Sequence, residues 1–216
     1  MSGIVNYIDG HKEKLLVETY TQVSGVVQST IVATVIGVLI GVAVYRSPGG
    51  SAIATALSSA ILTVPSFALI GLLIPVVGLG SEPAVIALVL YGLLPIVRNT
   101  IVGLGGVDPA ISDAARGIGL NRFGVLTRVE LPLAWPAILA GMRVTTQMLM
   151  GIAAIAAYAK GFGLGTEIFS GVARAGSANS LEQAVVGTVG IVILALILDG
   201  LYVIVSRLTT PRGLRA

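Results

Sequence analysis

The 216-residue chain has no cysteine, one histidine, few aromatic residues and little charge. Charged residues make up 11% of the sequence, whereas a soluble domain carries about 25%. The absence of cysteine excludes disulfides, thiolate metal sites and cysteine nucleophiles, and His11 alone leaves too little material for a histidine-based site. We therefore expect no metal site, no soluble enzyme and, despite a pI of about 9.4, no nucleic-acid binder.

Long apolar runs are what the sequence has instead: 55% of its residues are hydrophobic and the mean hydropathy is +0.97. A helix needs roughly 20 apolar residues to cross the hydrocarbon core of a bilayer. The pattern predicts an all-α polytopic membrane protein whose five spans cover residues 23–45, 47–81, 83–103, 137–158 and 184–206. The second run contains Pro65, Pro75 and Gly78, so it is one span kinked at Pro65 or two short spans, and we favour five spans over six.

The flanking segments and loops set the expected orientation. Residues 1–22 contain no apolar run of signal-peptide length and are expected to form an amphipathic lead-in at one membrane surface. Residues 23–206 form a single transmembrane domain, and 207–216 form a basic tail. Arginines gather in the 107–135 loop and in the tail, so the positive-inside rule places both in the cytoplasm and the N-terminus outside.

The 107–135 loop is long, polar and rich in local structural signals. Asp108-Pro109 is typical of a helix start, with an aspartate cap and proline at the first helical position. Ile111, Ala115 and Ile118 follow at helical spacing as one apolar stripe. Gly119 suits the left-handed conformation that ends a helix.

A second short helix is expected to follow in the same loop. Asn121 can cap it, Phe123 and Leu126 share one face, and Leu131-Pro132 should end it and return the chain to the membrane. The loop is therefore predicted to be a helix–turn–helix on the cytoplasmic face. Such a surface can dock into a groove of a partner protein, or it can simply lie on the membrane.

The motif within this loop resembles that of permease subunits of binding-protein-dependent ABC importers. Their motif runs EAA, three residues, Gly, nine residues, Ile-x-Leu-Pro, and here it is filled by Asp113-Ala114-Ala115, Gly119 and Val129-x-Leu131-Pro132. Asp replaces Glu and Val replaces Ile, and both changes keep the chemical type. The resemblance implies that this loop forms the coupling helices of a type I importer permease. It also implies that the ATP-binding subunit is contacted by Asp113, Ala114, Ala115, Gly119, Leu131 and Pro132.

The resemblance extends over roughly residues 24–214. The runs VPSFALIGLLIP, ALVLYGLLPIVRNT and KGFGLGTEIF look like those of the osmoprotectant group, whose permeases import glycine betaine, carnitine, choline and similar compatible solutes. The resemblance implies a cell-membrane protein that works with a cytoplasmic ATPase, an extracytoplasmic solute-binding protein and a second permease copy, identical or closely related. This chain has no G-x-x-x-x-G-K-[ST] loop, so ATP and Mg are expected on the partner ATPase and no cofactor on this chain.

Two groups of membrane residues are candidate sites. Asp199 lies inside an apolar run, where an ionisable group is expensive, and we expect a structural ion pair with Arg143 or with Arg207. Gln147, Gly151 and Tyr158 share one face of the fourth span with small residues between them. That weakly polar face could line the pathway of a small zwitterion, or it could be ordinary helix packing.

Three other classes of protein compete with this interpretation. A permease for amino acids or methionine would carry a similar loop. An ion-coupled secondary transporter would show internal repeats and several paired charges near the midplane, which the sequence does not suggest. An intramembrane enzyme would need a nucleophile or acid–base constellation, and there is no cysteine, no histidine cluster and no G-x-S-x-G.

Overall fold

The computed structural model describes residues 2–159 and 161–210, and every regular element within these ranges is helical, which confirms the predicted all-α fold. The elements are α1 (Ser2–Gly10), α2 (Lys12–Val44), α3 (Pro48–Thr63), α4 (Ser66–Val77), α5 (Glu82–Gly105), α6 (Pro109–Gly117), α7 (Arg122–Val125), the π-helical turn η1 (Leu126–Glu130), α8 (Leu131–Ala156), the 3-10 turn η2 (Ala157–Ala159), α9 (Gly165–Ala173) and α10 (Ser180–Thr209).

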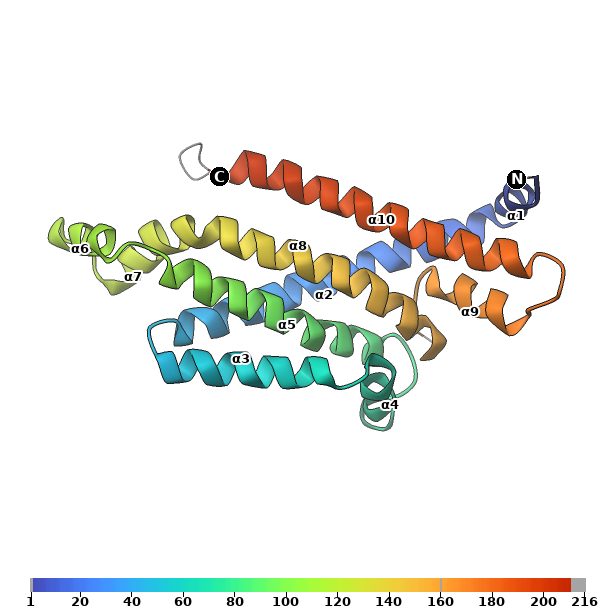
Figure 1. Cartoon of the computed structure of the whole chain (residues 1–216), viewed down its shortest axis with the longest axis horizontal. Helices are drawn as coiled ribbons and strands as arrows, with labels where there is room; N and C mark the ends of the chain where they lie inside the picture. The colour runs from blue at the N-terminus through green and yellow to red at the C-terminus, as the bar shows by residue number, and fades with distance from the viewer. Residues whose placement is uncertain (1, 160, 211–216) are drawn as a thin grey trace.

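Four helices in the described part of the chain are long and apolar enough to cross a bilayer: α2, α5, the continuous run Arg122–Ala159, and α10. The pair α3 and α4 passes the same test together but is bent by 94°, so the count is five if this pair is one broken span. The long helices lie side by side, with α6 and α7 at the same end as the C-terminal end of α10 (Figure 1). The N-terminus, α4 and α9 lie at the opposite end.

Pro65 breaks the second apolar run, for which the sequence left open one span kinked at Pro65 or two short spans. Val64 adopts an extended conformation, with ψ of 127°, because a residue before proline avoids the helical region. The Tyr91 hydroxyl donates a hydrogen bond to the freed Val64 carbonyl at 2.6 Å. Pro75, expected to help end the run, instead lies within α4, and the helix ends at Gly78, whose φ is +92°.

The expected boundary at residue 22 does not coincide with a helix end. The chain turns at His11, and α2 then continues from Lys12 to Val44. No glycine or proline lies between residues 12 and 24 to interrupt it. Gln22 is fully buried and its amide donates to the Met150 carbonyl at 3.2 Å, so this segment packs against α8. Of the expected tail, residues 207–209 extend α10, and 211–216 lie outside the described residues.

Leu131-Pro132 does not end a helix, contrary to expectation. The chain runs from α7 through the π-helical turn directly into α8, and the Leu131 N–H donates to the carbonyl of Leu126, five residues back. Pro132 then falls in the first turn of α8, where its missing N–H is tolerated. The second arm of the hairpin is therefore continuous with the membrane helix α8.

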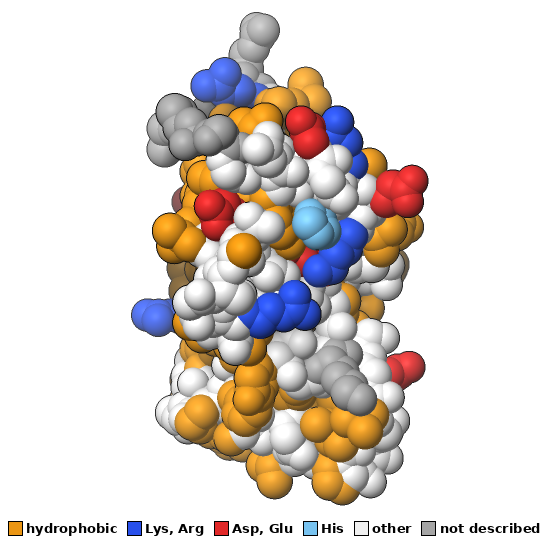
Figure 2. Space-filling view, turned by 90° about the vertical axis from the view of Figure 1, so that its right-hand side faces the viewer, with side chains coloured by type: hydrophobic (Ala, Val, Ile, Leu, Met, Phe, Trp, Pro, Cys, Tyr) orange, Lys and Arg blue, Asp and Glu red, His pale blue; other side chains and the backbone are white. Residues whose placement is uncertain are grey.

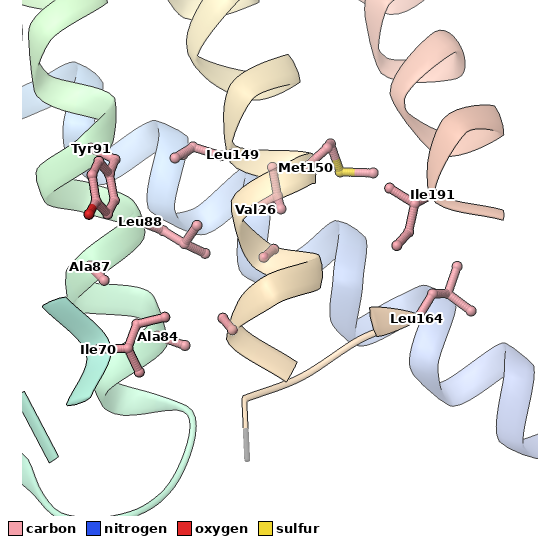
Figure 3. Packing of buried hydrophobic residues seen from close by; sticks show 12 residues of the cluster. Val26, Ile70, Ala84, Ala87, Leu88, Tyr91, Leu149, Met150, Leu164 and Ile191 are labelled. Atoms are coloured by element: carbon pink, nitrogen blue, oxygen red, sulfur yellow. The ribbon is translucent and has the colours of Figure 1, made fainter. Parts of the chain in front are cut away.

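The main apolar core joins residues from α2, α4, α5, α8 and α10, as Figure 3 shows for Val26, Ile70, Leu88, Leu149 and Ile191. Close helix packing comes from glycine. A Cβ on Gly37 would lie 2.7 Å from Ile96 Cγ2, and one on Gly41 would lie 2.5 Å from Thr100 Cγ2. The GxxxG of α2 therefore packs against α5 of the same chain.

Candidate functional site

The loop between α5 and α8 folds as a capped hairpin. The Asp108 carboxylate accepts a hydrogen bond from the Ala110 amide at 2.9 Å, and the Asn121 side chain accepts one from the Gly124 amide at 2.7 Å. Gly119 has φ of +95°, and the amides of Gly119 and Leu120 donate to the last carbonyls of α6. Asp108, Gly119 and Asn121 thus each lie where a helix begins or ends, as the sequence predicts.

The hairpin presents large apolar side chains away from the bundle. Ile118 is 82% exposed and Phe123 is 72% exposed, while Ile111 is partly exposed on the same helix pair. Arg116, paired to Asp113 at 2.8 Å, and Arg122 lie beside them. The predicted stripe is split, because Ala115 is buried against the bundle whereas Ile111 and Ile118 point outward. The exposed surface combines apolar anchors with charge, which is typical of a protein docking face.

The six motif residues divide into two groups. Asp113, Ala114, Gly119 and Pro132 are exposed. Ala115 is buried, and Leu131 packs against the smaller apolar cluster around Leu104, Ala134 and Ile138. The first group is available to a partner, and the second holds the hairpin on the membrane helices.

A buried acidic group that sequence reasoning missed lies directly behind the hairpin. The Glu130 side chain is 6% exposed. Its carboxylate accepts hydrogen bonds from Tyr45 Oη at 2.6 Å, from Arg46 Nη2 at 3.0 and 3.1 Å, and from Ser112 Oγ at 3.2 Å. Burial, together with the bond to this carboxylate, raises the pKa of Tyr45 to about 12, so the phenol remains a donor. The sequence does contain one sign of this buried group: Glu130 is an acidic residue between the apolar residues Val129 and Leu131.

The structure brings Asp199 together with Arg143 and Gln147. Arg143 Nε and Nη2 donate to the two Asp199 carboxylate oxygens at 2.5 and 2.6 Å, and the Gln147 amide donates to the same carboxylate. The two-pronged geometry is the strongest form of an arginine–carboxylate pair. Gln147, which the sequence suggested only as a pathway residue, therefore belongs to the same polar group as the ion pair, and the group joins α8 to α10.

The rest of the candidate pathway face lies open along α8. Gly151 is exposed, and a Cβ there would meet no atom within 4 Å. Tyr158 is 62% exposed, with edge-on contacts to Phe67 and Phe169. This face is not filled by packing within the chain, so a second subunit, lipid or solute must cover it.

A second polar cluster ties the N-terminal helices to α9. Glu167 is fully buried, and its carboxylate contacts Lys14 and the Tyr7 hydroxyl, while Thr166 donates to Glu18 at 2.7 Å. Burial raises the pKa of the Glu167 carboxyl, but Lys14 and Tyr7 outweigh burial and hold that pKa below its ordinary value. Charged side chains gather around His11 on this end of the molecule (Figure 2).

Together, the apolar helical bundle, the exposed hairpin at one end and the polar cluster at the other describe a multi-span helical membrane protein. Comparison with known proteins identifies its family. Residues 33–210 match the family described as the binding-protein-dependent transport system inner membrane component, and the chain belongs to it. In agreement with that family, the chain is a multi-pass membrane protein.

Relatives match over the whole chain. It is 34% identical to a choline transport system permease protein of Bacillus subtilis, covering 100% of this chain and 97% of the relative. It is also 34% identical to a glycine betaine/carnitine/choline transport system permease protein of the same organism, with the same coverage. An osmoprotectant import permease protein of Salmonella typhimurium is 40% identical over 72% of this chain and 73% of the relative.

Solved structures share the fold. A chain of the inward-facing MetNI methionine ABC transporter superposes with a TM-score of 0.78 at 21% identity, covering 91% of this chain and 96% of that one. A second crystal form gives a TM-score of 0.80 at 20% identity, with coverage of 94% and 99%. The protein therefore has the fold of an ABC importer permease.

Proposed function

We propose that this chain is the membrane-spanning subunit of an ATP-driven importer for a small quaternary-ammonium compatible solute such as choline, glycine betaine or carnitine. The observation that carries the proposal is the similarity along the full chain to permease proteins for choline and for glycine betaine, carnitine and choline. The chain performs no bond chemistry. It provides a pathway that opens alternately to the two sides of the membrane.

A separate ATP-binding subunit docks on the α6–α7 hairpin. Ile118, Phe123 and Ala114 supply the contact, and Asp113 and Arg116 set its charge pattern. ATP and Mg are held by that partner. The hairpin and the C-terminal end of α10 are then cytoplasmic, and the N-terminus and α9 face the solute-binding protein outside.

A second permease copy completes the pathway. The α10 helix exposes large apolar side chains along much of its length, including Leu196 and Leu201. Asp199 lies among them on α10 and is paired with Arg143 of α8, and a charged pair facing lipid would be costly, so this face is turned toward protein or water. Gln147, Gly151 and Tyr158 then line the route, with the Arg143–Asp199 pair holding α8 to α10.

Uptake measurements test the proposal and separate it from its competitors. Radiolabelled choline, glycine betaine, carnitine and methionine are offered to cells lacking endogenous uptake, with and without this chain, its ATPase and its binding protein. We expect uptake of a quaternary amine that needs all three components. Methionine uptake without amine uptake would keep the mechanism and overturn the substrate. Uptake with this chain alone would replace the proposal by a secondary transporter.

A further inference from the structure

Glu130 is the point where the docking hairpin, the end of α2 and the start of α8 meet. It is the last residue of the π-helical turn between α7 and α8. Its three partners come from two other places: Tyr45 and Arg46 follow α2, and Ser112 lies in α6. Turns of this kind are frequent at functional sites because they redirect a side chain without ending the helix.

The contacts of Glu130 form a complete set. One carboxylate oxygen accepts from Ser112 and Arg46, and the other accepts from Tyr45 and Arg46. The Arg46 guanidinium also lies over the Tyr45 ring, 5.0 Å from its centre. A buried carboxylate is tolerated only when it is paired and hydrogen-bonded in this way.

An apolar cluster lies directly on the membrane side of this polar group. Leu104 of α5, together with Ala134 and Ile138 of α8, packs with Val38 and Val42 of α2. Tyr45 belongs to this cluster through its ring and to the polar group through its hydroxyl. Ser112 and Glu130 therefore connect α6 to the end of α2, in addition to the path along the chain from α6 through α7 into α8.

We propose that Glu130 is a positioning residue that makes α6, the end of α2 and the start of α8 move as one body when the ATPase pushes on the hairpin. Ser112 is the specific link to α6, since it is the residue of that helix bonded to the carboxylate. The inference rests on the proposed function, because it concerns how work from a partner reaches the membrane. The docking face itself is formed by other residues.

The test uses the full chain reconstituted in proteoliposomes with its ATPase subunit and binding protein. The variants are Ser112→Ala, which cuts only the link to α6, Glu130→Gln, which removes the charge, and both together. Glu13→Gln, an exposed acid on α2, is the matched control. Three quantities are measured: ATPase subunit retained on purification, ATP hydrolysed, and solute transported per ATP.

We expect both single variants to retain the ATPase subunit and to hydrolyse ATP. Solute transported per ATP should fall about tenfold in Glu130→Gln, the factor that loss of a hydrogen bond to a charged group implies. It should fall less in Ser112→Ala, and the double variant should be no worse than Glu130→Gln, because Ser112 acts only through Glu130.

Three results would overturn the inference. Transport per ATP equal to that of Glu13→Gln in both variants would show that the contacts do not transmit motion. Loss of the ATPase subunit would make Glu130 part of folding or docking instead. Additive losses in the double variant would show that Ser112 acts elsewhere. Failure of the unaltered chain to depend on the ATPase would contradict the proposed function itself, which distinguishes the two failures.

Discussion

Arg143 and Asp199 are 56 positions apart in the chain and form a two-pronged ion pair, at 2.5 and 2.6 Å, between two apolar membrane helices. Removing one partner leaves the other charge unpaired in an environment that penalises it. We therefore expect Asp199→Asn and Arg143→Gln each to lower the yield and the thermal midpoint of the purified protein. The double variant should be more stable than either single variant, because no lone charge remains.

The exchange Arg143→Asp with Asp199→Arg separates structure from transport. It keeps one charge of each sign across the two helices. If the pair is only structural, this variant should recover stability and uptake together. Recovered stability with abolished uptake would assign the charges a direct role in the pathway, and unchanged stability of the single variants would contradict any structural role.

The absence of cysteine makes the pathway face directly testable. A cysteine at Gln147, which is exposed on α8, should react with a water-soluble thiol reagent in membranes, and the reaction should block uptake. Ala153 on the same helix is fully buried, so Ala153→Cys is the matched control and should stay unmodified. Equal labelling of the two positions would contradict a water-filled route along Gln147.

The sequence predicted those parts of the fold that depend on local signals. The caps at Asp108 and Asn121 and the left-handed Gly119 are single-residue preferences, and each lies where it was expected. Asp199 was a conspicuous charge in an apolar run with few possible partners. Glu130 was missed, because its partners Tyr45 and Arg46 lie 85 and 84 positions away and no local pattern brings them together.

The different outcomes at two prolines also have a physical origin. Pro65 and Pro132 carry the same local preference, yet one breaks a helix and the other is absorbed in the first turn of α8. What differs is the surrounding structure: Tyr91 satisfies the carbonyl freed before Pro65, whereas a widened turn precedes Pro132. The Tyr91 hydrogen bond depends on tertiary packing, and the position of Pro132 depends on where α8 begins. The sequence pattern reveals neither.

The attachment of the N-terminal helix to α9 should weaken in acid. The Glu167 carboxyl has a pKa below its ordinary value in the folded protein, so its contribution to stability is complete above that ordinary value and is lost as the pH falls through the lowered one. Its neighbours are Tyr7, Lys14, Glu18 and Gln183.

Hydrogen exchange of the α1 amides provides the measurement. The part of this protection that depends on Glu167 should be constant well above pH 4.5, the ordinary pKa of this side chain, and should decline below it. In Glu167→Gln the decline in protection caused by protonation of this carboxyl should disappear. Protection should already be lower at neutral pH, because Lys14 has lost its charged partner. An acid step of the same size in Glu167→Gln would assign the titration to another group.

Two neighbouring glycines allow a controlled test of the hairpin. Gly119 has φ of +95°, a conformation that costs a residue with a side chain about 1–2 kcal/mol. Gly117 is the last residue of α6, and a Cβ there would meet nothing within 4 Å. Gly119→Ala should therefore distort the turn and reduce the amount of ATPase subunit bound, whereas Gly117→Ala should leave binding unchanged, because α6 ends at Gly117 in open space. Because both substitutions add the same methyl group to the same exposed hairpin, a difference between them reports backbone geometry and not added bulk. Equal binding by both variants would mean that docking does not depend on the backbone geometry of this turn, and it would then depend on the exposed side chains of the hairpin, such as Ile118 and Phe123.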